Sequence, residues 1–284
     1  MHRFIPLMLL MNIVANAGIH QVTFGEDLDD EPAWSPDGTR IVFQRIALDL
    51  GWIVDIYMKN INSSGHATRI TFDLYTDAGA CWSPDGNKIA FSATRNGAYG
   101  TWIRDIQTLE EIYFSDGTYP SWSLAGNFVA ITKGSSSTWN IWKKNVNTGV
   151  ETQLTFETGQ NALPDVSNDG SKIVFEHGDV NPGIWVVSSE GGTITQLPVS
   201  GYRPRWSPDG NKICFDAGPL SADFIYIYDL TTGQLTNTYI EGMNTDWSPL
   251  GDKIAYKYNG NIYYFDYPLI LEPTTLGRIK ARYR

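Results

Sequence analysis

A strand-like pattern of alternating apolar and polar residues recurs along the chain, each time around a Trp that precedes a tight turn. It reads PAWSPDGTRIVF from Pro32 and ACWSPDGNKIAF from Ala80. It returns as PSWSLAGNFVAI, PDVSNDGSKIVF, PRWSPDGNKICF and TDWSPLGDKIAY, which start at residues 120, 164, 204 and 245. Ser-Pro-Asp-Gly favours a turn because Pro presets φ, Asp caps nearby amides and Gly tolerates positive φ. Each phrase therefore predicts two antiparallel strands joined by a tight turn.

The phrases share an anchor position, and its spacing predicts the fold. The six anchors are Trp34, Trp82, Trp122, Val166, Trp206 and Trp247, at intervals of 40 to 48 residues. Such a period is that of a propeller blade. An Ile-aromatic strand such as Ile56-Tyr57 and a fourth strand of the type Gln-Leu-Thr-Phe, at 153–156, complete the repeat. We predict an all-β protein: a six-bladed β-propeller of four-stranded antiparallel blades over residues 18–266.

The last repeat ends after its third strand, near Asp266, and lacks a fourth. The missing pattern stands at the other end of the chain, as Gln21-Val22-Thr23-Phe24. We therefore expect residues 19–24 to pair with 262–266 in the C-terminal blade. This pairing would close the ring and remove an open sheet edge.

Repeats of the form xPxWSPDGxxIAF resemble the PD40, or WD40-like, repeats of TolB-type propellers, and the resemblance covers residues 19 to 266. It implies the propeller fold. It implies no single activity, because propellers serve as binding modules, lyases and lactonases alike. Three repeats depart from the pattern, with Leu124-Ala125 for Pro-Asp, Val166 for Trp and Leu250 for Asp. We expect looser turns or altered packing in these blades.

The two ends read as segments outside the propeller. Residues 1–17 combine Arg3, an apolar run and Ala15-Asn16-Ala17, the pattern of a cleaved signal peptide, which predicts a periplasmic or secreted protein. The alternative, a membrane anchor, would need about 20 apolar residues, so we expect no transmembrane span. Residues 267–284 form a basic C-terminal tail, which is either a frayed end, a docking or sorting peptide, or a segment that adheres to an anionic surface.

Charge and cysteine content narrow the classes of partner. The net charge is −10, and the basic tail makes the predicted propeller more acidic still. Such a surface repels phosphate backbones, so we expect no nucleic acid partner. Cys81 and Cys214 lie in distant strand-like segments, and we expect two buried free thiols and a monomer.

The repeated residues have a structural interpretation. The anchor Trp side chains are expected to pack between blades. Asp37, Asp85, Asp169 and Asp209 could be read as calcium ligands, but turn capping fits them better because they lack dense acidic spacing.

Candidate binding residues come from what differs between repeats. The loops before the first strand and after the second vary, so the face that carries them is the expected binding face. Residues three before each anchor should surround the channel mouth there: Glu31, Gly79, Tyr119, Leu163, Arg203 and Asn244, with Asp30 and Tyr202 beside them.

An acidic loop accompanies these positions, with Glu26, Asp27, Asp29, Asp30 and Glu31, and with Asp49, Asp73 and Asp77 on nearby loops. It is read as a solvated loop, as a surface for a basic partner, or as a cation site. Arg45, Arg203 and Arg205 offer a positive patch whose direction the sequence leaves open.

No catalytic motif stands out, because GxSxG, HExxH and a zinc-spaced His/Cys cluster are all missing from the sequence. We therefore expect a non-catalytic extracytoplasmic module without a cofactor, which binds a protein or glycan through the loop-rich face. The alternative is a metal-dependent lyase or lactonase with its site at the central channel.

Overall fold

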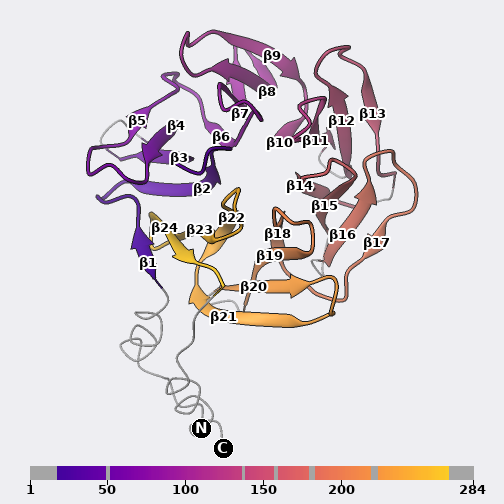
Figure 1. The fold of residues 1–284 in the computed structure, drawn as a ribbon. Helices are drawn as coiled ribbons and strands as arrows, with labels where there is room; N and C mark the ends of the chain where they lie inside the picture. Colours follow the sequence, from indigo (N-terminus) through magenta and orange to yellow (C-terminus); the bar gives the residue numbers. More distant parts are fainter. Residues whose placement is uncertain are drawn as a thin grey trace, which may run out of the picture.

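The computed structural model describes residues 18–48, 52–135, 138–156, 159–178, 183–218 and 223–268. They form six four-stranded antiparallel sheets that stand around a common centre, with the first strand of each blade innermost (Figure 1). The predicted six-bladed all-β propeller is confirmed. In this part of the chain no helix has the length and apolar character to cross a membrane.

The strands follow the chain from blade to blade. Blade 1 has β2 (Leu28–Trp34), β3 (Arg40–Ala47), β4 (Ile53–Asn60) and β5 (Thr68–Arg69). Blade 2 has β6 (Asp77–Trp82), β7 (Lys88–Arg95), β8 (Ala98–Asp105) and β9 (Glu111–Ser115). Blade 3 has β10 (Thr118–Trp122), β11 (Phe128–Ser135), β12 (Thr138–Asn145) and β13 (Glu151–Gln153). Blade 4 has β14 (Asn161–Val166), β15 (Lys172–His177), β16 (Gly183–Ser188) and β17 (Thr195–Gln196).

The last two blades complete the ring. Blade 5 has β18 (Tyr202–Trp206), β19 (Lys212–Ala217), β20 (Phe224–Asp229) and β21 (Leu235–Glu241). Blade 6 has β22 (Met243–Trp247), β23 (Lys253–Tyr258), β24 (Asn261–Asp266) and, from the other end of the chain, β1 (Ile19–Gln21). The third strand of blade 6 thus has a fourth strand beside it.

Ring closure occurs as the sequence predicts. β1 pairs antiparallel with β24, with Ile19 opposite Phe265 and Gln21 opposite Tyr263. The N–H of Val22 then donates to Ile262 O at 2.8 Å, and the N–H of Ile262 donates to Thr23 Oγ1 at 2.9 Å. Figure 1 shows the indigo strand β1 beside the yellow strand β24.

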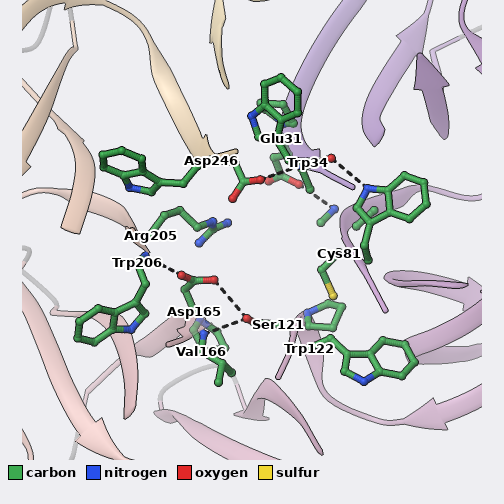
Figure 2. Close-up of a pocket in the computed structure, with 18 of the residues that line it drawn as sticks. Glu31, Trp34, Cys81, Ser121, Trp122, Asp165, Val166, Arg205, Trp206 and Asp246 are labelled. Carbon is green, nitrogen blue, oxygen red and sulfur yellow. Dashed lines mark hydrogen bonds between the residues drawn. The ribbon is translucent and has the colours of Figure 1, made fainter. Parts of the chain in front are cut away.

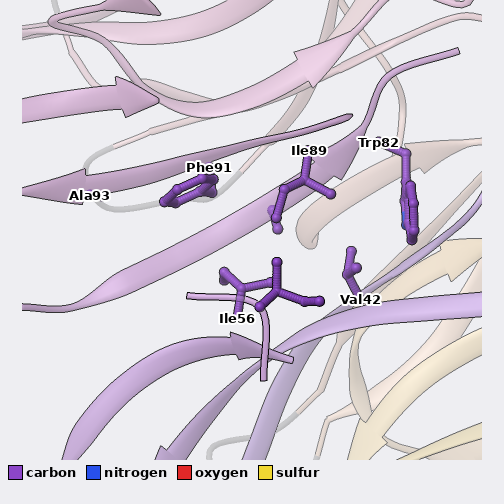
Figure 3. Close-up of a cluster of buried hydrophobic side chains, with 8 residues drawn as sticks. Val42, Ile56, Trp82, Ile89, Phe91 and Ala93 are labelled. Carbon is purple, nitrogen blue, oxygen red and sulfur yellow. The ribbon is translucent and has the colours of Figure 1, made fainter. Parts of the chain in front are cut away.

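The hydrophobic core is divided into clusters that each join two neighbouring blades. Figure 3 shows one of them, where Val42 and Ile56 of blade 1 face Trp82, Ile89 and Phe91 of blade 2. All six anchors contribute to such clusters, Trp122 from a partly buried position. The expected role of the anchors in packing between blades is confirmed.

A Ser after each anchor organises the turns. Ser167 Oγ donates to Asp169 at 2.7 Å and accepts the N–H of Lys172 at 3.0 Å. Hydrogen bonds from Ser167 and Ser171 lower the pKa of Asp169 to about 2. The Asp side chains of these turns therefore act as caps, as expected.

The departing repeats keep their turns. In blade 3 the N–H of Gly126 donates to Ser123 O at 2.8 Å, and in blade 6 the N–H of Gly251 donates to Ser248 O at 2.9 Å. Asn127 and Asp252, one position after the turn glycine, accept the Ser hydroxyl instead of the missing Asp. The expectation of looser turns in these two blades is therefore wrong.

Candidate functional site

The innermost strands enclose a cavity of about 410 Å³ (Figure 2). Three rings of residues line it, one residue per blade in each. The mouth ring, nearest the loop-rich face, is Glu31, Gly79, Tyr119, Leu163, Arg203 and Asn244. The inner ring, directly before the anchors, is Ala33, Cys81, Ser121, Asp165, Arg205 and Asp246. The turn ring is Pro36, Pro84, Leu124, Asn168, Pro208 and Pro249.

An irregular backbone holds the mouth ring in place. All six of its residues have φ between 49° and 61°, and the register of every first strand pair shifts there. Positive φ is uncommon for residues other than Gly and needs support from the surroundings. Sequence reasoning placed these residues at the mouth but did not predict the bulge.

That support comes from the preceding blade at five of the six positions. The N–H groups of Tyr119, Leu163, Arg203 and Asn244 donate to side chains of the blade before, at 2.8 to 3.2 Å: Ser92, Thr132, Glu176 and Asp216. At blade 2 the acceptor is Glu31 Oε2, 2.8 Å from the N–H of Gly79. The mouth therefore has a fixed backbone that joins neighbouring blades.

The mouth carries charges of both signs. Burial, with the charge of Asp30, raises the pKa of Glu31. Arg203 Nη1 lies 2.8 Å from Asp216 Oδ2, and burial raises the pKa of that carboxyl to about 6. Asn244 donates to Asp30 across the boundary between blades 6 and 1. These polar contacts hold Asp30 and Arg203 in defined positions beside the cavity.

Two tyrosines accompany Glu31. Tyr119 lies against Gly79, where a Cβ atom would come within 3.1 Å of its ring, so this position of the mouth favours glycine. Burial and the nearby Glu31 carboxylate raise the pKa of Tyr119 and also that of Tyr99, whose side chain is 57% exposed. Tyr99, at the start of β8, therefore belongs to the same surface, although sequence analysis did not select it.

The inner ring forms a second set of contacts between blades. Asp165 Oδ2 accepts the N–H of Trp206 at 2.7 Å, and Asp246 Oδ2 accepts the N–H of Trp34 at 2.7 Å. Ser121 Oγ accepts the N–H of Val166 at 3.0 Å. These side chains connect blades 3, 4 and 6 to the anchor of the next blade, as the dashed lines in Figure 2 show.

Burial controls the ionisation of this inner ring. It raises the pKa of Asp246 to about 7, raises that of Asp165, and raises that of the Cys81 thiol to about 12. Cys81 and Cys214 are free cysteines, as expected. Cys214 is buried, whereas the expected full burial of Cys81 is wrong, because this neutral thiol is partly exposed and lines the cavity.

Asp246 gives a testable pH dependence of stability. In the native state the Asp246 carboxyl keeps its proton up to about pH 7, whereas an Asp in the unfolded chain loses its proton at about pH 4. The native state binds more protons between these values, so this group makes the unfolding free energy fall as pH rises. Asp246→Asn keeps an acceptor for the N–H of Trp34 and cannot ionise. Denaturant unfolding at a series of pH values from about 4 to about 7 should show the variant gaining on the wild type as pH rises, with a constant difference at higher pH. A difference that does not change across this range would contradict the prediction.

The structure separates the acidic segment into several environments. Asp29 is 1% exposed, and Arg45 donates to both of its oxygens at 2.6 and 2.8 Å. Asp77 is equally buried against Arg95, which also pairs with Asp73 at 2.9 Å. Asp29 and Asp77 thus belong to the framework of the ring rather than to an exposed acidic surface, and Arg45 does not form a free positive patch.

The remaining candidates lie nearer to solvent. Glu26 is exposed, Asp27 accepts the N–H of Leu48 at 3.2 Å, and Tyr202 is partly exposed at the start of β18. Asp49 lies outside the described residues, as do residues 1–17 and 269–284. Within the described chain, no three His, Cys, Asp or Glu side chains gather in a way that could hold a metal ion.

Most of the inner ring was not predicted from the sequence. Arg205 was expected only as part of a positive patch whose direction was open, and neither Asp165 nor Asp246 was among the candidate residues. A signal was present, since the residue before the anchor reads Ala, Cys, Ser, Asp, Arg and Asp while its neighbours hardly vary. Residues two apart on a strand share a face, so these positions point the same way as the mouth ring.

Comparison with known proteins supports the fold and leaves the activity open. No protein-family model matches the sequence. An uncharacterised protein of Agrobacterium fabrum is 32% identical over 98 residues, and this match spans a third of either chain. The chain is also similar to two oligogalacturonate lyase structures, one from Vibrio parahaemolyticus (TM-score 0.61, 14% identity, 89% of this chain and 94% of that one) and one in complex with manganese (TM-score 0.59, 13% identity, 92% and 99%).

Two further similar structures carry the name TolB. One, from Agrobacterium tumefaciens, has a TM-score of 0.72 at 20% identity and covers 88% of this chain and 97% of its own. The other, from Acinetobacter baumannii, has a TM-score of 0.63 at 19% identity, and the match spans 86% of this chain but about half (55%) of that longer one. The resemblance seen in the repeats is confirmed at the level of the fold: the chain is a six-bladed β-propeller similar to the propellers of TolB proteins.

Proposed function

We propose that this chain is an extracytoplasmic, non-catalytic module that binds a protein or glycan partner through its loop-rich face. The observation that supports this most strongly is the mouth of the cavity, where Tyr99, Tyr119, Glu31 and Arg203 gather over a backbone fixed by contacts between blades. Tyr and Arg are enriched at interfaces because they combine apolar area with directed polar groups. A fixed backbone also reduces the entropy lost on binding.

The runner-up is a metal-dependent lyase or lactonase, which the fold similarity to oligogalacturonate lyase favours. Its expected site is the same channel. The carboxylates there are already engaged, Asp165 and Asp246 by anchor N–H groups and Glu31 by Gly79. The described residues therefore fit a metal centre less well than a binding surface, and we place the binding role first.

The proposal includes export of the protein, and this part rests on the signal-peptide pattern of residues 1–17. The acidic net charge is a separate argument against a nucleic acid partner.

Partner capture from the cell envelope tests the binding role directly. The full chain carries an affinity tag, and the proteins and glycans that it retains are compared with those retained by a Tyr99→Ala/Tyr119→Ala variant.

We expect the double variant to lose the specific partner while it remains folded, because both side chains lie at the surface of the mouth. The matched control is Leu250→Ala, whose side chain is 86% exposed in a turn on the opposite face. Equal retention by all three proteins would show that the loop-rich mouth is not the binding surface.

A further inference from the structure

The inner ring has two unlike halves. Blades 1 to 3 contribute the small side chains of Ala33, Cys81 and Ser121, whereas blades 4 to 6 contribute Asp165, Arg205 and Asp246. Figure 2 shows Arg205 directed into the cavity between the two Asp side chains, with Cys81 and Ser121 on the other side. The cavity at this level therefore has room beside the small half and charge on the other half.

Most of the hydrogen-bond donors of the Arg205 guanidinium have no partner among the described residues. Within the described residues its guanidinium makes one hydrogen bond, from Nη1 to Pro204 O at 3.2 Å, and no carboxylate oxygen lies within ion-pairing distance of 4.0 Å. A guanidinium has five N–H donors in a planar fork. The other Arg side chains of the described segments are paired, as in Arg45 with Asp29 and Arg95 with Asp77. Arg205 differs in that its fork faces open space.

Neither of the flanking carboxyl groups, those of Asp165 and Asp246, forms an ion pair with Arg205. Asp165 is held by the N–H of Trp206 and by Ser121 Oγ, and Asp246 by the N–H of Trp34. Burial raises the pKa of both, that of Asp246 to about 7. Near neutral pH Asp246 thus spends much of its time as a neutral carboxyl, which can donate a hydrogen bond to an anion. The charged groups that act on it are Arg205 and Asp165.

We propose that the inner ring binds a carboxylate group of a ligand that enters through the mouth ring, with Arg205 as the main contact. A monoanionic carboxylate matches the guanidinium fork and tolerates the neighbouring acids, whereas a dianionic phosphate would be repelled by Asp165 and Glu31. The cavity volume of about 410 Å³ suits a small acid or the end of a chain. This inference rests on the proposed binding function and specifies the chemistry at the base of its site.

Pairs of charged and neutral probes test the proposal. They also distinguish the two sources of the carboxylate, an acidic sugar and a free carboxyl terminus of a peptide. Binding to the full chain is measured by calorimetry for D-glucuronate against D-glucose, and for triglycine against triglycinamide, so that each acid has a neutral partner. We expect at least one acid to bind more tightly than its neutral partner. Preference within the sugar pair identifies an acidic sugar, and preference within the peptide pair identifies a free carboxyl terminus.

Two substitutions in the cavity and one control outside it test whether Arg205 contacts the carboxylate of the ligand. Arg205→Gln should weaken binding of the preferred acid by about tenfold or more. Arg40→Gln removes the same charge at the start of β3, outside the cavity lining, and should leave the affinity unchanged. Above pH 7 the Asp246→Asn variant should bind the acid more tightly than the wild type does. The affinity of the wild type should fall as pH rises, whereas that of the variant should not. Because this last variant gains affinity, misfolding cannot imitate it.

The proposal is wrong if neither acid outperforms its neutral partner, or if Arg205→Gln and Arg40→Gln bind the acid equally. Envelope capture reports separately on the proposed function. A partner that depends on Tyr99 and Tyr119, combined with no acid preference, would reject only the carboxylate site. Acid binding without any captured partner would reject only the wider binding role.

Discussion

Removal of residues 18–24 is expected to lower the free energy of unfolding by about 5 kcal/mol or more, a large part of the total stability of a domain. The segment supplies β1, the backbone contacts of Val22 and Thr23 with Ile262, and the Val22 side chain. Val22 is 4% exposed in the cluster that joins blades 6 and 1. Its burial contributes about 2 kcal/mol, each lost hydrogen bond adds about 1 kcal/mol, and β24 becomes an open edge.

Denaturant unfolding of residues 18–284 and 25–284 measures this loss. The control is Phe24→Ala, because Phe24 belongs to the same sequence motif but is 70% exposed. That substitution should change the unfolding free energy by less than about 0.5 kcal/mol. Similar stabilities for the two chain lengths would contradict the closed ring as the source of stability.

Much of the architecture was predictable because the repeat is redundant. Six copies of one strand-turn-strand phrase establish the period even though Val166 and Leu250 break individual positions. The closure was predictable for the same reason, since Gln21 to Phe24 repeats a motif seen in other blades. Pairing in fact involves residues 19 to 23, and Phe24 lies outside the ladder.

The site was less predictable because its chemistry depends on side chains that meet across blades. Nothing near Asp29 in the sequence indicates that Arg45 will bury it, or that Asp30 will meet Asn244. The mouth bulge also escaped prediction, because Gly79 and Asn244 are the only residues of the ring whose types favour positive φ. Tyr119, Leu163 and Arg203 adopt it through hydrogen bonds from their N–H groups to the preceding blade.

Loss of Arg95 is the substitution for which we expect the largest effect of a single side chain. Arg95 Nη1 and Nη2 lie 2.7 and 2.9 Å from the two oxygens of Asp77, which is 0% exposed, and Nε lies 3.1 Å from Glu111. Arg95→Met would leave a buried carboxylate without its partner, at a cost of about 3–5 kcal/mol. Arg40→Met, which breaks a pair with the half-exposed Asp37, should cost less than about 1 kcal/mol.

The pH dependence distinguishes the loss of this ion pair from a general loss of packing. Burial raises the pKa of Asp77 even with Arg95 in place. Without Arg95 the pKa should rise further, so the native state of Arg95→Met binds a proton that the unfolded state releases, and its deficit should shrink as pH falls. The double variant Asp77→Asn/Arg95→Met removes the charge and should recover part of the stability at neutral pH. The contrary result is a loss of unfolding free energy that is constant with pH and unchanged in the double variant. It would mean that Arg95 acts through packing on Phe91 rather than through Asp77. The guanidinium carbon of Arg95 lies 5.6 Å from the centroid of the Phe91 ring.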